Sequence, residues 1–237
     1  MNINKTLAGL AFKCLTKIYS DNGCWITCTF FYQYMKVRKE IRKSIEPYVA
    51  KYAVTSPGIA QEKYLDIDFW ALESLYRYYC LGLHDGGKIR ILDIGTGAGY
   101  FPFVCKYFGH KVEAIDVPDN HMYNDIAGAL RIHRHLMRIK SFRSIELEGE
   151  FDLVTAFMVC FNNHKQQDLW CTKEWQFFLN DLNVHNLREG ALVYLALNKE
   201  TETEPVSTKL LEYFRLSGAI VESNVVQVRQ DTYKFGG

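Results

Sequence analysis

Three glycines at every second position, Gly95, Gly97 and Gly99, are the residues of this chain with the clearest chemical meaning. Because glycine has no Cβ, a ligand can approach the backbone of such a turn closely. The apolar run 89–92 before the turn predicts a short buried strand, and the spacing in 100–108 predicts a helix after it. A strand, a glycine turn and a helix N-terminus together present free backbone N–H groups, which is typical of a site for nucleotide-like ligands.

An acidic residue, Asp116, ends the next predicted strand, 111–116. It follows Gly95 by about 20 residues, the spacing at which a carboxylate accepts both hydroxyl groups of a bound ribose. A P-loop is excluded because no lysine followed by serine or threonine comes after the last glycine. The position that would complete a dinucleotide-type G-x-G-x-x-G pattern is Tyr100, which disfavours a nicotinamide dinucleotide.

The pattern resembles the class I S-adenosylmethionine-dependent methyltransferases. The glycine motif 92–100 and the strand-end acid in 114–117 carry this resemblance. Two further stretches, 151–157 and 187–195, are similar to the family's fourth strand and to its passage into the fifth strand. The resemblance covers residues 66–237, in the order that the family shows.

The resemblance implies that the glycine turn binds the methionine and ribose portions of S-adenosylmethionine. Gly95, Thr96, Gly97 and Gly99 are the residues of the turn that would line the cofactor. Asp93, two residues before the first glycine, would orient the turn and contact the ammonium end of the cofactor, directly or through water.

Further cofactor contacts are implied at the ends of the later strands. Asp116 would bind the ribose hydroxyls, with Val117 against the adenine ring. Phe142, in the segment after the third strand, would lie by the adenine edge. Phe157 and Met158, at the end of the fourth strand, would face the methyl group.

The run 160–164 follows the fourth strand, where this family places groups that contact the acceptor. His164 is the candidate general base for an alcohol or a protonated amine, and Asn162 is the candidate for positioning the acceptor. The run lacks the Asn/Asp-Pro-Pro-aromatic motif of the methyltransferases that act on nucleic-acid amino groups, which disfavours that activity. The pair His133 and His135 has no further ligand cluster near it, so no metal is expected.

Composition predicts one main globular domain with an attached N-terminal unit. The chain has 237 residues and a net charge of +1, which argues against a strongly basic nucleic-acid binder. Its seven cysteines form no C-x-x-C pair, which favours free thiols in the cytoplasm. Residues 1–65 carry ten Lys and Arg against four Asp and Glu, whereas 66–237 carry 18 against 23. We therefore expect an N-terminal unit at 1–65 and the cofactor-binding domain at 66–237.

Two helices are predicted within residues 1–65. Apolar residues recur at helical spacing from Leu7 to Ile18, and Asp21-Asn22-Gly23 is expected to end that helix. The second helix has one apolar face and is expected to stop at Pro47; that face comprises Phe30, Tyr34, Val37, Ile41 and Ile45. Charged residues interrupt every window long enough to span a bilayer, and no signal-peptide pattern is evident.

Two interpretations of residues 1–65 remain open. One is a helical cap or lid on the catalytic domain. The other is an interfacial amphipathic helix whose basic stretch 36–39 lies near anionic lipid as a peripheral membrane contact.

The remaining pattern predicts an α/β fold with a doubly wound, mostly parallel, seven-stranded sheet and an N-terminal helical cap. Asp66 or Asp68 is expected to cap a helix that reaches Gly82 and buries Phe69, Leu72, Tyr76, Tyr79 and Leu83. Further helices are expected at 121–130, around 175–182 and at 208–216. Strands are expected at 89–94, 111–116, 135–139, 152–158, 191–197, 219–228 and 232–235, the last two as a hairpin.

The function that this resemblance implies is methyl transfer from S-adenosylmethionine to a small-molecule, saccharide or lipid-linked acceptor. Two alternatives stay open at this point. One is a non-catalytic module that binds S-adenosylmethionine as a partner or regulatory subunit, since binding residues and catalytic residues are different sets. The other, which the glycine pattern disfavours, is a nicotinamide-dependent oxidoreductase.

Overall fold

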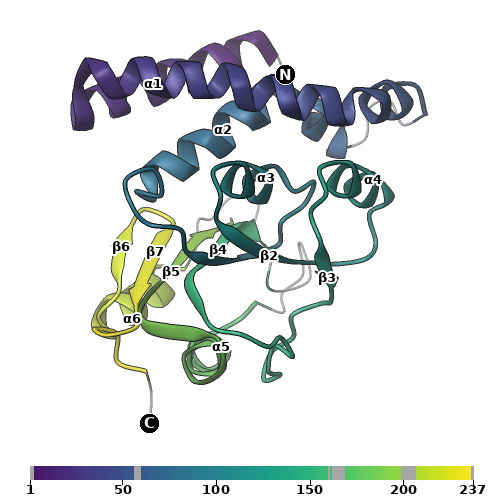
Figure 1. Ribbon diagram of the computed structural model, residues 1–237. Helices are drawn as coiled ribbons and strands as arrows, with labels where there is room; N and C mark the ends of the chain where they lie inside the picture. Colours follow the sequence, from purple (N-terminus) through teal and green to yellow (C-terminus); the bar gives the residue numbers. More distant parts are fainter. Residues whose placement is uncertain (1–2, 56–59, 160, 162–168, 199–206, 236–237) are drawn as a thin grey trace. The chain divides into compact units, whose positions relative to one another are not determined.

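A computed structural model describes residues 3–55, 60–159, 161, 169–198 and 207–235 (Figure 1). The chain divides into two compact units, and each unit is built from separate stretches of the sequence. The first unit comprises 1–88, 97–110 and 118–133 and is helical in its described part. The second comprises 89–96, 111–117 and 134–237 and holds the sheet.

The sheet has seven strands in the described part of the chain, in the order β3-β2-β1-β4-β5-β7-β6. The strands are β1 (Arg90–Ile94), β2 (Lys111–Asp116), β3 (Arg134–Leu136), β4 (Phe151–Val159), β5 (Leu187–Leu197), β6 (Ile220–Glu222) and β7 (Val225–Arg229). The first five strands pair in parallel, and β7 runs antiparallel to β5 and to β6. The predicted doubly wound, mostly parallel sheet is therefore confirmed.

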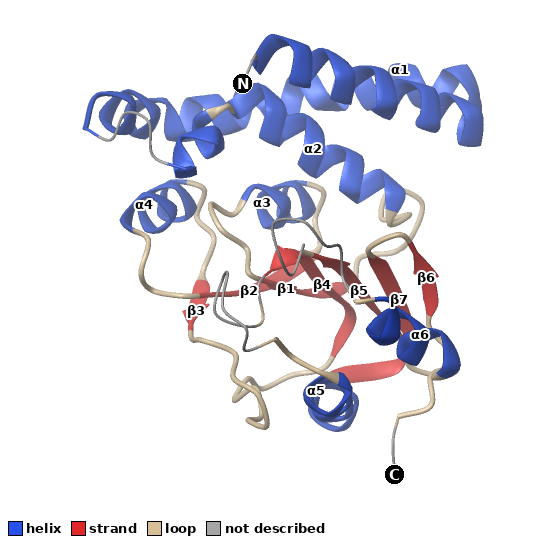
Figure 2. Ribbon diagram, turned by 180° about the vertical axis from the view of Figure 1, so that it is seen from behind, coloured by secondary structure: helices blue, strands red, loops and turns tan. Residues whose placement is uncertain are grey.

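Two helices belong to the same unit as the sheet, α5 (Thr172–His185) and α6 (Thr208–Leu216). Figure 2 shows them beside the β5, β7 and β6 part of the sheet. Phe178 and Leu179 of α5 and Phe214 of α6 are buried in one apolar core with strand residues such as Val154 and Val193. The apolar faces of α5 and α6 therefore pack against the apolar face of the sheet.

The C-terminal hairpin is shorter than predicted. Its turn lies at Ser223, which has a left-handed φ of +55°, so the strand expected over 219–228 is two strands. The segment 232–235 is not a strand, although Tyr233 is buried within the core. The third strand also ends at Leu136, short of the expected 139. A serine in the left-handed region is an uncommon turn signal, which explains why the pattern missed it.

The first unit contains α1 (Ile3–Thr55), the 3-10 helix η1 (Ala60–Leu65), α2 (Ile67–Cys80), α3 (Tyr100–Tyr107) and α4 (His121–Ala129). The prediction that one helix ends at Asp21-Asn22-Gly23 was wrong, because helical backbone continues through these residues. Figure 1 shows that α1 is not straight and that its purple N-terminal part turns back toward the later part of the same helix. A glycine inside a helix costs about 1 kcal/mol relative to alanine, which weakens a helix without ending it.

The expected stop at Pro47 was also wrong, because α1 runs on to Thr55. Contacts beyond the proline explain why the helix persists. Tyr52 is buried and its hydroxyl donates to Asp125 Oδ2 of α4 at 2.7 Å, and Lys51 Nζ lies 2.7 Å from the same oxygen. Tertiary contacts of this kind override a local breaker signal.

The predicted apolar face of the second half of α1 is confirmed. Phe30, Val37, Ile41 and Ile45 are at most 1% exposed, and Tyr34 is partly buried. The facing helix α2 is capped by Asp66, whose side chain accepts from Phe69 N at 3.0 Å, as expected.

The predicted buried side of α2 is confirmed in part. Leu72, Tyr79 and Leu83 are buried as expected, whereas Phe69 and Tyr76 are only partly buried. Ala71, Leu75 and Tyr78 are buried as well. Aromatic residues occur all around this helix, so spacing alone did not identify which of them face inward.

An ion-pair cluster joins α1 to α2. Arg38 Nη2 donates to Asp68 Oδ2 at 2.9 Å, and Arg42 Nη2 donates to Asp68 Oδ1 at 2.9 Å. The hydrogen bonds from Arg38 are the main cause that lowers the pKa of Asp68 below its ordinary value of 3.8. The pairs keep partial exposure, so solvent screens them and each contributes modestly.

The depressed pKa of Asp68 predicts a specific pH dependence. A carboxylate whose pKa is lower in the folded state stabilises the fold above its unfolded pKa, and this contribution is lost as pH falls through the folded value. We expect Asp68→Asn to lower the free energy of unfolding by about 0.5 to 1 kcal/mol at neutral pH and by less at about pH 3. Urea unfolding at several pH values measures this, with Glu150→Gln, an exposed carboxylate, as the control. A difference that does not change with pH would contradict the role of Asp68.

Among the residues that the structure describes, no helix is both long and apolar enough to cross a bilayer.

Candidate cofactor-binding site

The glycine turn follows the last residue of β1 and has the backbone that only glycine adopts freely. Gly95, Gly97 and Gly99 have left-handed φ values of +68°, +57° and +83°. The amides of Gly95 and Thr96 both donate to Ile115 O of β2, at 2.8 and 3.2 Å. The start of the turn is therefore held beside the end of β2, where Asp116 lies.

The first glycine is required by packing within the second unit. A Cβ on Gly95 would lie 2.3 Å from Val159 Cγ2, at the end of β4. Val159 reaches this position because β4 carries an irregularity between Phe157 and Val159, where Met158 has a left-handed φ of +57°. Sequence reasoning missed this bulge, because nothing in the sequence pattern of β4 marks it.

The other two glycines differ from each other. A Cβ on Gly99 would come within 3.3 Å of Ile132 Cγ1, so Gly99 allows close packing within the first unit. A Cβ on Gly97 would meet nothing closer than a ring carbon of Tyr123, at 4.0 Å. Packing against the described residues does not require glycine at 97, so space is open at the position that a side chain would occupy.

The turn also carries a polar group without a partner. The Thr96 hydroxyl oxygen is buried and makes no hydrogen bond to any described residue. A buried polar atom of this kind costs free energy unless a ligand or water satisfies it. The Thr96 hydroxyl therefore fits a ligand that supplies a hydrogen-bonding group.

Asp116 ends β2 and is held in a fixed orientation. Its Oδ1 accepts from Val117 N at 2.7 Å, and its Oδ2 lies 3.6 Å from Arg134 Nη1 at the start of β3. The side chains of Asp116 and Arg134 are only 10% and 5% exposed. Burial lowers the pKa of Arg134, and the neighbouring Asp116 opposes this effect. The pairing with Arg134 was not predicted, because it depends on how β3 aligns with β2.

Asp93 lies within β1 and is 3% exposed. Its Oδ1 accepts from Thr155 Oγ1 of β4 at 2.7 Å, and Thr155 is fully buried. This bond ties β1 to β4 directly before the glycine turn. The contact of Asp93 with the cofactor ammonium stays a prediction.

The structure places the two predicted phenylalanines in different surroundings. The Phe157 ring lies 5.7 Å from the Tyr194 ring of β5. Phe142 is 54% exposed in the turn after β3, and its ring lies 5.8 Å from that of Phe177 of α5. Their roles beside the methyl group and the adenine stay predictions. Asn162 and His164 lie outside the described residues.

An aromatic cluster that the sequence did not predict lies at the start of α3, in the first unit. Tyr64 stacks on Trp70 at 4.7 Å and meets Tyr123 edge-on at 5.1 Å between ring centroids. The Tyr100 hydroxyl donates to Tyr64 O at 2.6 Å, and burial raises the pKa of Tyr100. Because Tyr123 is the side chain nearest to the open face of Gly97, the cluster supplies an apolar aromatic neighbour for that face.

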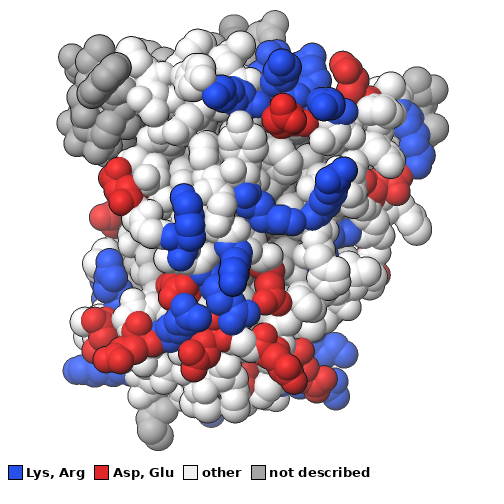
Figure 3. Space-filling view, viewed as in Figure 1, with Lys and Arg blue, Asp and Glu red and all other residues white. Residues whose placement is uncertain are grey.

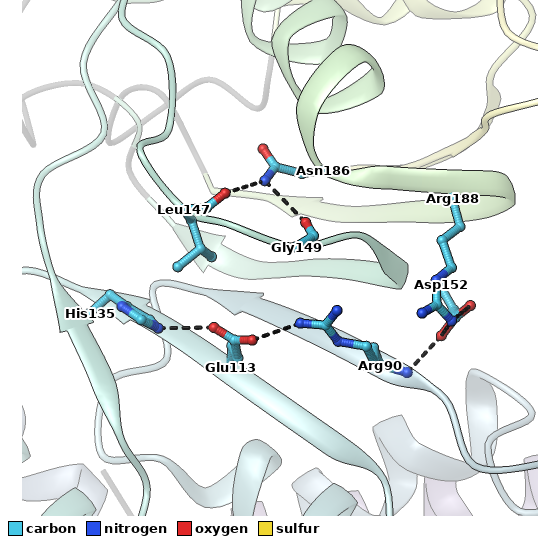
Figure 4. A network of polar contacts seen from close by, with 8 residues as sticks. All are labelled: Arg90, Glu113, His135, Leu147, Gly149, Asp152, Asn186 and Arg188. Atoms are coloured by element: carbon cyan, nitrogen blue, oxygen red, sulfur yellow. Dashed lines mark hydrogen bonds and ion pairs between the residues drawn. The ribbon is translucent and has the colours of Figure 1, made fainter.

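A separate polar network begins at the other end of β1 (Figure 4). Glu113 of β2 accepts from Arg90 Nη2 at 3.0 Å and lies 3.0 Å from His135 Nε2. Asp152 accepts from Arg90 N at 2.7 Å and from Arg188 Nη1 at 3.1 Å. His135 therefore contacts a carboxylate, and no cluster suited to a metal ion occurs among the residues described.

The strand order, with its antiparallel β7, and the glycine turn after β1 define the Rossmann-like fold of the class I S-adenosylmethionine-dependent methyltransferases. No protein-family model matches the chain, and no curated protein matches it.

Solved structures that are similar in fold include three bacterial proteins. S-adenosylmethionine-bound CalS10, an amino pentose methyltransferase from Micromonospora echinaspora, is 20% identical, with a TM-score of 0.41, over 54% of this chain and 50% of that one. Streptomyces venezuelae DesVI is 17% identical, with a TM-score of 0.43, over 56% and 53%. The chain therefore spans about half the length of these two.

The third is the Burkholderia thailandensis 1,6-didemethyltoxoflavin-N1-methyltransferase, solved with 1,6-didemethyltoxoflavin and S-adenosylhomocysteine. It is 15% identical, with a TM-score of 0.48, over 84% of this chain and 89% of that one. These likenesses concern the fold.

Proposed function

We propose that this protein binds S-adenosylmethionine and transfers its methyl group to a small-molecule, saccharide or lipid-linked acceptor. The observation that carries the proposal is the left-handed φ of +57° at Gly97, where the described residues leave open space at the position of a side chain. The turn that contains it follows β1, and Asp116 ends the neighbouring parallel strand β2. Ligands of doubly wound sheets bind beyond the carboxyl ends of such strands.

The residues of the turn and of β2 supply the groups that this cofactor needs. Asp116 accepts hydrogen bonds from the ribose hydroxyls, and Arg134 and the Val117 amide keep its carboxylate in place. Backbone amides of the turn and the Thr96 hydroxyl serve the methionine portion. The cofactor itself supplies an electrophilic sulfonium methyl, so the protein has to position the acceptor atom and exclude water.

The catalytic roles of Asn162 and His164 are part of the proposal and rest on their place after β4. His164 would remove a proton from a hydroxyl or a protonated amine, and Asn162 would orient the acceptor. The net charge of +1 supports an acceptor other than nucleic acid.

The role of residues 1–65 as a helical cap that shapes the acceptor site also belongs to the proposal. Two sets of contacts support it. Arg38 and Arg42 hold α1 to Asp68 of α2, and Lys51 and Tyr52 hold it to Asp125 of α4.

A calorimetric titration with S-adenosylmethionine, S-adenosylhomocysteine and NAD separates the candidate functions. We expect both sulfur-containing ligands to bind and NAD not to bind. NAD binding alone would replace the proposal with a nicotinamide-dependent oxidoreductase. Binding of S-adenosylmethionine without transfer to any acceptor in a panel of sugars, lipid-linked sugars and small molecules would favour the non-catalytic module.

A further inference from the structure

One face of α1 exposes large apolar side chains. The side chains of Phe31, Tyr32 and Met35 are 56%, 60% and 45% exposed. Residues three and four positions apart lie next to each other on a helix, so Met35 lies beside both Tyr32 and Phe31 and the three side chains form one surface. A contiguous exposed surface of this kind marks an interaction site more often than single exposed residues do.

Lysines continue the same face in the next turns of α1. Lys36, Lys39 and Lys43 are exposed, and Lys36 Nζ lies 4.3 Å from the centroid of the Tyr32 ring. No acidic side chain within the described part of the chain forms an ion pair with Lys39 or Lys43. Figure 3 shows Lys and Arg side chains gathered over α1, with some Asp or Glu side chains among them.

The structure also shows which basic residues of α1 already bind a carboxylate and so do not contribute free charge to this face. Within the basic stretch 36–39, Val37 is fully buried and Arg38 is bound to Asp68, as is Arg42. Lys51 is bound to Asp125. The free positive charge therefore lies with Lys36, Lys39 and Lys43, on the side of the helix that carries the exposed apolar residues.

We propose that this face of α1 docks on an anionic membrane surface; the α1 patch that does so comprises Phe31, Tyr32, Met35, Lys36, Lys39 and Lys43. Aromatic and apolar side chains enter the boundary between headgroups and acyl chains, while lysines contact the lipid phosphates. Lys36, Lys39 and Lys43 outnumber the acidic residues of the same stretch, Glu40 and Glu46, and this excess of positive charge is complementary to anionic lipid. In this proposal the helix lies on the membrane surface, in agreement with its mixed apolar and charged face.

Vesicle flotation with the full chain tests the charged half of the patch. We expect binding to phosphatidylcholine vesicles that contain about a third phosphatidylserine, no binding to phosphatidylcholine alone, and weaker binding as salt is raised. The triple variant K36Q/K39Q/K43Q should bind about a hundredfold more weakly, since each lysine near such a surface contributes about fivefold. The matched control K111Q/K173Q/K209Q removes three exposed lysines of the other unit and should bind like the wild type.

The apolar half is tested with F31S/M35S, which we expect to lower binding at fixed charge. The control V184S/L216S changes two side chains that are 71% and 74% exposed elsewhere and should leave binding unchanged. None of the substituted residues is buried, so we expect the variants to keep their fold. Circular dichroism checks that their helix content is unchanged. Equal binding of the patch variants and the wild type would overturn the proposal, as would equal binding to both kinds of vesicle. Self-association that the patch variants abolish, without vesicle binding, would assign the face to a second copy of the chain.

Discussion

Asp116→Ala is expected to bind S-adenosylmethionine and S-adenosylhomocysteine about ten- to a hundredfold more weakly than the wild type. The substitution removes charge-assisted hydrogen bonds to the ribose, which contribute about 1.5 to 3 kcal/mol. The carboxylate is held in place by the Val117 amide and by Arg134, so its loss is not compensated by a nearby flexible group. Isothermal titration calorimetry measures the change.

The same substitution is expected to lower stability, because it leaves the buried Arg134 without this carboxylate. Glu113→Gln is the matched control, since Glu113 lies on the same strand and also binds an arginine, Arg90, near the other end of β1. We expect the control to lose stability but to keep cofactor affinity. An Asp116→Ala protein that stays folded and binds S-adenosylhomocysteine as tightly as the wild type would contradict the assignment of Asp116.

Gly97→Val is expected to abolish measurable cofactor binding. A β-branched residue adopts a φ of +57° only at a cost of about 1 to 3 kcal/mol, and its side chain would fill the open face at which the ligand approaches. Gly190→Val is the matched control: Gly190 has a φ of +73°, and a Cβ there would lie within 4 Å of no described neighbour. The two variants should have similar melting temperatures, and only Gly97→Val should lose binding.

Gly95→Ala separates packing from ligand binding at the same turn. Its Cβ would clash with Val159, so we expect it to lower the melting temperature more than Gly97→Val does. Thermal unfolding and calorimetry on the three variants give the comparison. Retention of full cofactor affinity in Gly97→Val would show that the open face does not receive the ligand.

Elements whose signal is local were predicted well from the sequence. The limits of β2 and α6 coincide with the predicted 111–116 and 208–216, and the apolar face of α1 from Phe30 to Ile45 is buried as expected. Short apolar runs between turn residues and a helical period of 3.6 are sufficient to define such elements.

Features that depend on distant contacts were not predicted. The helix α1 passes Pro47 because Lys51 and Tyr52 bind Asp125, which lies far along the chain. The bulge at Met158 is defined by the pairing of β4 with β5. Neither interaction leaves a pattern within its own stretch of sequence.

The same distinction holds for the site. The left-handed backbone of the glycine turn was predicted because three closely spaced glycines are typical of it, whereas the roles of the turn and of Asp116 toward a ligand stay predictions. The contacts of Asp116 with Arg134, of Asp93 with Thr155 and of Gly95 with Val159 join separate strands, so they required the structure.

The most direct measurement is nuclear magnetic resonance of the backbone amides of the wild-type protein during titration with S-adenosylhomocysteine. The account predicts large shifts of the Thr96, Gly97 and Val117 amide signals and no shift at Gly190 or Gly218, which lie elsewhere in the fold. Saturable binding that leaves the Thr96, Gly97 and Val117 signals unmoved, or no binding at all, would contradict it.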